Sequence, residues 1–272
     1  MATGMSLHLG LNAVDPVHYQ GWAGELSACE FDANDMAAIA GIKGFKTKTL
    51  LTKAAKIQPV VAGIAAASKA LKAGDIFMLT YSGHGGQVPD INGDEGDMMD
   101  ETWCLFDGEL LDDEIHAALG GFVAGVRVLV FSDSCHSGSV VKNNAVVDAV
   151  TSESTARYRA MPNEVAQRTY FAHKAAYDAR QQNKATQKAK AAAKASVLLI
   201  SGCQDNQLSA DGVFNGLFTG TLKSVWNGGA FKSDYRAFHK KIVSRMPPDQ
   251  TPNLFWAGLV NPAFLGQEVF KV

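Results

Sequence analysis

The sequence predicts an α/β protein built on a mostly parallel sheet, and three segments carry that prediction. Residues 76–81 and 126–131 are short apolar runs of the kind found in strands that are buried on both faces. Residues 57–71 form an Ala-rich amphipathic pattern with helical spacing and precede the first of these strands. Strand, helix and strand in succession are typical of βαβ units, and therefore of a parallel sheet.

The remaining elements follow the same pattern along the chain. Residues 6–14 alternate and end at a turn, which predicts a first strand. A helix follows, with apolar residues at helical spacing (Phe31, Met36, Ile39 and Ile42). Further strands are predicted at residues 45–51, 102–106, 196–201 and 253–257, and further helices from Asp112 or Asp113 and at residues 213–225 and 233–246.

Composition narrows the class of protein. The 272 residues are 47% hydrophobic, enough to bury a full core, and the net charge of −2 draws the chain neither to nucleic acid nor to a membrane. No apolar run is long enough to span a membrane, and the N-terminus lacks the pattern of a signal peptide. Four scattered cysteines suit a reducing compartment. We expect a cytoplasmic monomer.

The candidate catalytic residues follow the ends of two predicted strands. The run at residues 126–131 stops at small polar residues and Cys135, and the run at 76–81 stops at Ser82, Gly83 and His84. Neighbouring parallel strands would bring His84 and Cys135 to the carboxyl edge of the sheet, where ligands bind in such folds. A thiol nucleophile needs a base of this kind, because only the thiolate attacks. A buried structural cysteine is the alternative.

Four motifs in order, YSGHGG, DETWCLFDG, FSDSCHSGS and SGCQDNQLSAD, resemble those of the metacaspases, in particular the prokaryotic orthocaspases. The resemblance extends from about Leu7 to the C-terminus, and the Gln-Ala-Cys-x-Gly signature of caspases proper is absent. It implies the caspase-haemoglobinase fold, a three-layer α/β/α sandwich around six or more strands. It also implies one peptidase domain over residues 1–272, with a large-subunit-like part (1–140), a basic linker-like insertion (141–195) and a small-subunit-like part (196–272).

The resemblance further implies a cysteine endopeptidase in which His84 and Cys135 form the dyad. The N–H groups of Gly85 and Cys135 would be the oxyanion donors. The substrate pocket would contain Asp32, Ser82 and Asp133. Taken alone, Asp32 is better interpreted as a solvated or N-capping residue early in a helix. Two carboxylates in a pocket would attract a Lys or Arg side chain and repel Asp, so we expect a peptide or protein substrate cleaved after Arg or Lys.

Calcium is the family property on which this sequence departs from its relatives. The acidic residues 90–101 resemble an EF-hand loop, but Glu95 replaces the required Gly. The resemblance instead aligns Asp100, Asp112 and Asp113 with three calcium ligands, although acidic residues in a first helical turn also suit the helix dipole. The fourth position is Lys142. We expect that no cofactor is required, that calcium binds weakly at most, and that Lys142 pairs with these carboxylates.

The basic segment at residues 173–195 predicts an exposed helix, and it lacks the interleaved aromatic residues of a nucleic-acid platform. We expect slow self-cleavage within residues 140–195, with candidate sites at Lys174, Arg180, Lys184, Lys188, Lys190 and Lys194. Two alternatives to a peptidase stay open. One is a catalytically silent scaffold or peptide-binding module. The other is an esterase, which would require a Gly-x-Ser-x-Gly elbow that no strand end provides.

Overall fold

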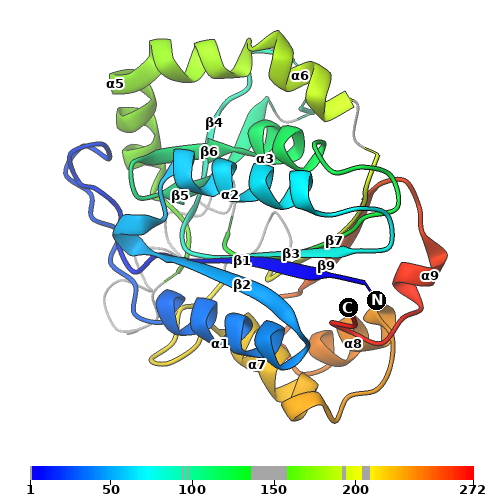
Figure 1. The fold of residues 1–272 in the computed structure, drawn as a ribbon. Helices are drawn as coiled ribbons and strands as arrows, with labels where there is room; N and C mark the ends of the chain where they lie inside the picture. Colours follow the sequence, from blue (N-terminus) through cyan, green and yellow to red (C-terminus); the bar gives the residue numbers. More distant parts are fainter. Residues whose placement is uncertain (1, 94, 97, 136–157, 192–193, 204–208) are drawn as a thin grey trace.

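A six-stranded sheet organises the chain (Figure 1). The computed structural model describes residues 2–93, 95–96, 98–135, 158–191, 194–203 and 209–272. The strand order is β2-β1-β3-β7-β8-β9, and all pairs are parallel except the last. The strands are β1 (Gly4–Gly10), β2 (Phe45–Leu51), β3 (Ile76–Ser82), β7 (Arg127–Asp133), β8 (Ser196–Ser201) and β9 (Asn253–Gly258). The predicted α/β class and its mostly parallel sheet are confirmed.

Helices cover both faces of this sheet and complete three layers, as Figure 1 shows. On one face lie α2 (Ile57–Ala70) and α3 (Asp112–Leu119), and on the other α1 (Cys29–Ile42), α7 (Leu217–Trp226) and α8 (Tyr235–Val243). Each face has its own apolar core, because every residue of β3 is buried and its side chains alternate between the two. Three further helices are short: η1 (Thr52–Ala54), η3 (Asn227–Gly229) and α9 (Pro262–Leu265).

A second, antiparallel sheet was only partly predicted. It consists of β4 (Gly85–Pro89), β5 (Met99–Leu105) and β6 (Gly108–Leu111), of which the sequence indicated β5 alone. β4 continues directly from the His84 end of β3 and pairs with β5, and the sequence did not indicate this strand. This sheet extends the carboxyl edge of the main sheet beside the two candidate catalytic residues.

The basic segment is more tightly packed than predicted. It forms α5 (Asn163–Gln181) and α6 (Lys184–Ala191), and α5 buries Tyr170, Tyr177 and Gln181. The Tyr177 hydroxyl lies 3.2 Å from a carboxylate oxygen of Glu109 on β6, which ties the helix to the second sheet. No helix among the described residues is long and apolar enough to cross a membrane.

Candidate active site

The ends of β3 and β7 bring His84 and Cys135 to the same edge of the sheet. These strands pair in parallel with Ser82 opposite Asp133, so each candidate residue follows its strand end by the same two positions. Both side chains are buried, at 6% exposure for His84 and 0% for Cys135. The Cys135 sulfur contacts the backbone of Ser209, accepting from its N–H and lying 3.7 Å from its carbonyl oxygen.

The His84 ring is held in one orientation by Gly24. Its Nε2 lies 3.0 Å from the Gly24 carbonyl oxygen, which can only accept, so Nε2 carries the proton of the neutral ring. Nδ1 then has the lone pair, and no described residue donates a hydrogen bond to it. Burial lowers the pKa of His84 to about 4, against the opposing effects of the backbone of Gly24 and of Ala160. The ring is therefore neutral at pH 7, the state in which Nδ1 accepts a proton.

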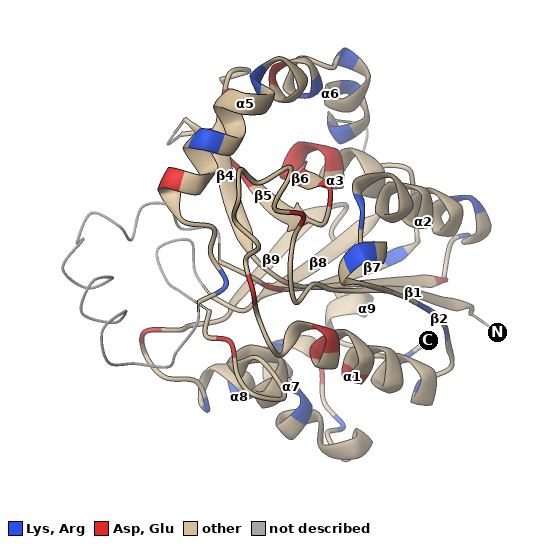
Figure 2. Cartoon of the chain, turned by 90° about the vertical axis from the view of Figure 1, so that its left-hand side faces the viewer, with Lys and Arg blue, Asp and Glu red and all other residues tan. Residues whose placement is uncertain are grey.

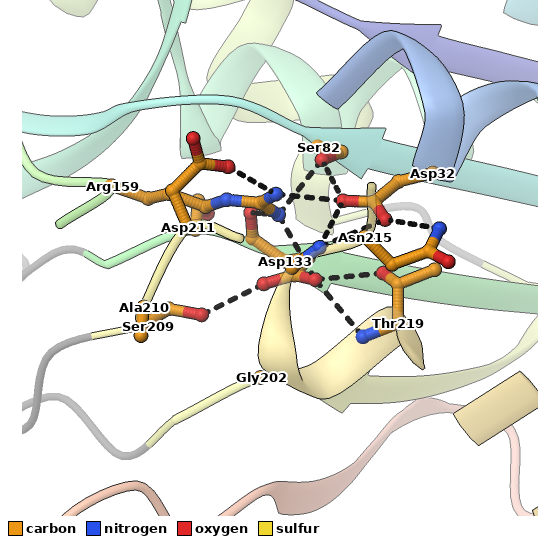
Figure 3. A network of polar contacts seen from close by, with 12 residues as sticks. Asp32, Ser82, Asp133, Arg159, Gly202, Ser209, Ala210, Asp211, Asn215 and Thr219 are labelled. Atoms are coloured by element: carbon orange, nitrogen blue, oxygen red, sulfur yellow. Dashed lines mark hydrogen bonds and ion pairs between the residues drawn. The ribbon is translucent and has the colours of Figure 1, made fainter. Parts of the chain in front are cut away.

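An acid pocket lies beside these two residues, and the guanidinium of Arg159 fills it (Figure 3). We use this name for Asp32, Ser82, Asp133 and Asp211. Arg159 donates to the Ser82 hydroxyl at 2.8 Å and forms ion pairs of 2.7 Å with Asp32, 2.9 Å with Asp133 and 2.9 Å with Asp211. Its side chain is 0% exposed.

The electrostatics of the acid pocket follow from three carboxylates around one cation. Burial alone would lower the pKa of Arg159, but Asp133, Asp32 and Asp211 hold it well above its usual value. Burial raises the pKa of Asp32 to about 6, and Arg159 acts against this rise. Asp133 also accepts from the hydroxyls of Ser209 and Thr219, both at 2.7 Å, which fix its orientation. The pocket is thus preorganised for a positive side chain.

The backbone of Arg159 lies against the two N–H groups expected to be the oxyanion donors. Its carbonyl oxygen accepts from the N–H of Gly85 at 2.9 Å and from that of Cys135 at 3.1 Å. The Arg159 N–H donates to the Ser209 carbonyl at 3.0 Å, and the Met161 N–H donates to that of Gly85 at 2.8 Å. An extended segment therefore occupies the groove between β4 and the residues around Ser209.

The structure brings Asp32, Ser82 and Asp133 together around Arg159. Asp32 is neither solvated nor an N-cap, since it is 1% exposed and the N-cap is Ala28. Sequence reasoning missed Asp211, Arg159 and Gly24. The only available signal for Asp211 was its place in the last of the four motifs. Arg159 and Gly24 give no local signal, because their partners are distant in sequence.

Two of the three expected calcium ligands lie in one cluster of the described residues. Asp112 and Asp113 lie near His116, with ligand atoms within 4.8 Å of one another, and Asp100 is not a member of that group. Asp113 is paired with Lys190 of α6, which lies over the acidic start of α3 (Figure 2). Lys142 lies outside the described residues. Calcium takes six to eight oxygen ligands. This group of two carboxylates and one imidazole does not supply them by itself, and Lys190 is paired with one of the two carboxylates.

The chain is similar to a known protein family, to curated relatives and to a solved structure. The caspase domain model matches residues 13–264. Metacaspase-1 of Coccidioides immitis is 30% identical over 76% of the chain, and Metacaspase-1A of Aspergillus terreus is 29% identical over 84%. The chain spans 51% and 64% of the lengths of these two relatives. The crystal structure of protein GSU0716 from Geobacter sulfurreducens matches with a TM-score of 0.89 and 62% identity, covering 99% of both chains.

Proposed function

We propose that this chain, which belongs to the caspase-domain family and is of the metacaspase kind, is a cysteine endopeptidase that cleaves peptide bonds after arginine or lysine. One observation carries the proposal. A peptide carbonyl lies between the N–H groups of Gly85 and Cys135 while the side chain of the same residue, an arginine, fills the acid pocket. The same residue therefore fills the acid pocket with its side chain and presents its carbonyl to the two N–H groups.

The reaction follows from the placement of these groups. His84 Nδ1 takes the thiol proton, and the Cys135 sulfur attacks the carbonyl carbon. The developing oxyanion is stabilised by the N–H groups of Gly85 and Cys135, and loss of one such donor typically costs ~10²–10³ in rate. The leaving amine receives the proton from His84. Water then hydrolyses the thioester and restores the thiol.

Specificity follows from charge and from shape. Three carboxylates in a buried pocket attract a cationic side chain, and they repel an aspartate side chain by like charge. The planar guanidinium forks toward Asp32, Asp133 and Asp211 at once, a geometry that suits arginine better than the compact ammonium of lysine. Arginine is accordingly the preferred residue.

Turnover of matched peptides with Arg, Lys or Asp before the scissile bond tests the proposal. Cys135→Ala and His84→Ala should lose turnover by at least ~10²-fold and retain their folded circular-dichroism spectra. Cys203→Ala is the matched control, because this buried thiol contacts the Ser134 carbonyl at 3.4 Å and the proposed mechanism assigns it no step. Near-parental turnover by Cys135→Ala would refute the peptidase, and preference for Asp would refute the specificity.

A further inference from the structure

We propose that Arg159–Ala160 is the bond that this chain cuts in itself, in cis, and that Arg159 blocks the acid pocket until the cut is made. The inference rests on the proposed function and names its first substrate. It changes where self-cleavage is expected, because Arg159 was not among the candidate sites in the basic segment.

The segment around Arg159 is bound as an extended peptide substrate would be. Ala160 bridges to Gly85 in parallel, and Tyr158 bridges to Ala210 in antiparallel orientation. Peptide recognition by strand addition uses such main-chain contacts for affinity and a side-chain pocket for specificity. Both parts are present here, since the Arg159 side chain is fully buried in the acid pocket.

The scissile carbonyl is also in place for attack. It accepts from the N–H groups of Gly85 and Cys135, at 2.9 and 3.1 Å. The Cys135 sulfur and the Arg159 N–H both contact the Ser209 carbonyl oxygen, so the nucleophile lies beside the residue whose carbonyl it would attack. Neither contact requires a second copy of the chain.

Five of the six candidate sites predicted from sequence present the opposite geometry, and the sixth, Lys194, lies beyond the end of α6. Lys174 and Arg180 lie within α5, and Lys184, Lys188 and Lys190 lie within α6. A helix does not fit a groove that pairs with extended backbone. Three of these residues are also held in ion pairs, Lys174 with Asp178, Arg180 with Glu114 and Lys190 with Asp113. The extended geometry therefore favours Arg159 over all five.

The cut is an ordinary hydrolysis. The Cys135 sulfur forms a bond to the Arg159 carbonyl carbon, and the C–N bond to Ala160 breaks as His84 returns the thiol proton to the Ala160 nitrogen. Water then hydrolyses the thioester, leaving a carboxylate on Arg159 and a free thiol. The products are residues 1–159 and 160–272.

Before the cut, Arg159 competes with any other substrate. A segment tethered to the same chain has a high effective concentration at the groove, so an external arginyl peptide competes poorly. Removal of the guanidinium takes away all three ion pairs. Arg159→Gln should therefore raise the initial rate on a small arginyl peptide at least about tenfold over the uncut parent.

The experiment follows the purified full-length chain by intact-mass and N-terminal analysis while it hydrolyses a small arginyl peptide. We expect a new N-terminus at Ala160, a lag whose length does not depend on protein concentration, and no cut in Cys135→Ala. Arg159→Gln should stay intact and show no lag. Arg168→Gln, at an exposed position of α5, is the matched control and should behave as the parent does.

The outcomes separate this inference from the proposed function. If Arg159→Gln hydrolyses arginyl peptides while the parent is never cut at Arg159–Ala160, only the inference fails. A parental lag in Arg159→Gln would refute the blocking role, and a lag that shortens with protein concentration would refute cleavage in cis. If neither chain cuts itself or any peptide, the proposed function itself fails.

Discussion

Gly216 lies against the guanidinium that fills the acid pocket. A single methyl group at this position should shift the preference of the pocket from arginine toward lysine. A Cβ at Gly216 would lie 2.5 Å from both Cζ and Nη2 of Arg159 and 2.6 Å from its Nη1. The three nearest atoms thus belong to the occupant. The backbone has φ −59°, which alanine adopts without strain. In the Arg159→Gln background, which has no guanidinium in this space, Gly216→Ala should therefore add no strain to the fold and reject only a substrate side chain that enters the pocket.

The size of the effect follows from the displacement. Carbon atoms in ordinary contact are about 3.5–4 Å apart, so the guanidinium must retreat by about 1 Å. That shift breaks its hydrogen bonds to Asp32 and Asp133, each worth about 1.5–3 kcal/mol because both partners are charged. Loss of two such bonds lowers kcat/KM for arginyl peptides about 10²–10⁴-fold. Lysine lacks the planar fork and should lose less, so the preference moves toward lysine.

The measurement is kcat/KM on paired arginyl and lysyl peptides, made in the Arg159→Gln background so that no cleavable segment competes. Gly220→Ala is the control, because its Cβ would meet only the Asn215 Cβ at an ordinary 3.4 Å. Unchanged kcat/KM for arginyl peptides in Gly216→Ala would show that external substrates do not use the pocket that holds Arg159.

Three further predictions follow. Because burial raises the pKa of Asp32 to about 6 and only its carboxylate binds a cation, KM for arginyl peptides should fall from pH 5 to 8, and Asp32→Asn should abolish that trend. Burial raises the pKa of Glu109 to about 7, so its stabilisation is present below pH 4.5 and lost above 7. Glu109→Gln should therefore increase the free energy of unfolding at pH 8 by up to about 3 kcal/mol, seen as a higher melting temperature, and leave both nearly unchanged at pH 4. Chelator should leave turnover intact, and millimolar calcium should stabilise Lys190→Gln more than the parent, whereas strict calcium dependence of the parent would contradict the Asp113–Lys190 pairing.

The main sheet, and the edge at which His84 and Cys135 lie, were predictable because buried parallel strands carry continuous apolar runs that end abruptly. Those ends alone placed His84 and Cys135 together. Helix α1 was predicted less well, since Met36 and Ile39 are buried but Phe31 and Ile42 are 50% and 69% exposed. Helical spacing identifies the helix, and only its neighbours determine how wide the buried face is.

What sequence reasoning missed depends on long-range contacts. β4 contains two glycines and a proline, which disfavour strands, and it forms because it pairs with β5. Arg159 resembles a surface arginine, yet its partners Asp32 and Asp211 are 127 and 52 residues away. Nothing local marks such a residue. The compact packing of α5 escaped prediction for the same reason, because Tyr177 reaches Glu109 at a separation of 68 residues.

The acid pocket also constrains how the chain can fold. Asp32, Asp133 and Asp211 are each at most 3% exposed, and buried carboxylates of like charge repel one another unless a cation lies between them. Removing one member of a buried ion pair typically costs ~3–5 kcal/mol, so the empty pocket is the costly state. Arg159 supplies the cation within the same chain, before any substrate is present. The residue that relieves this repulsion is then the one whose carbonyl faces Gly85 and Cys135. In our proposal, stable folding of the pocket and blocking of the active site therefore depend on the same residue.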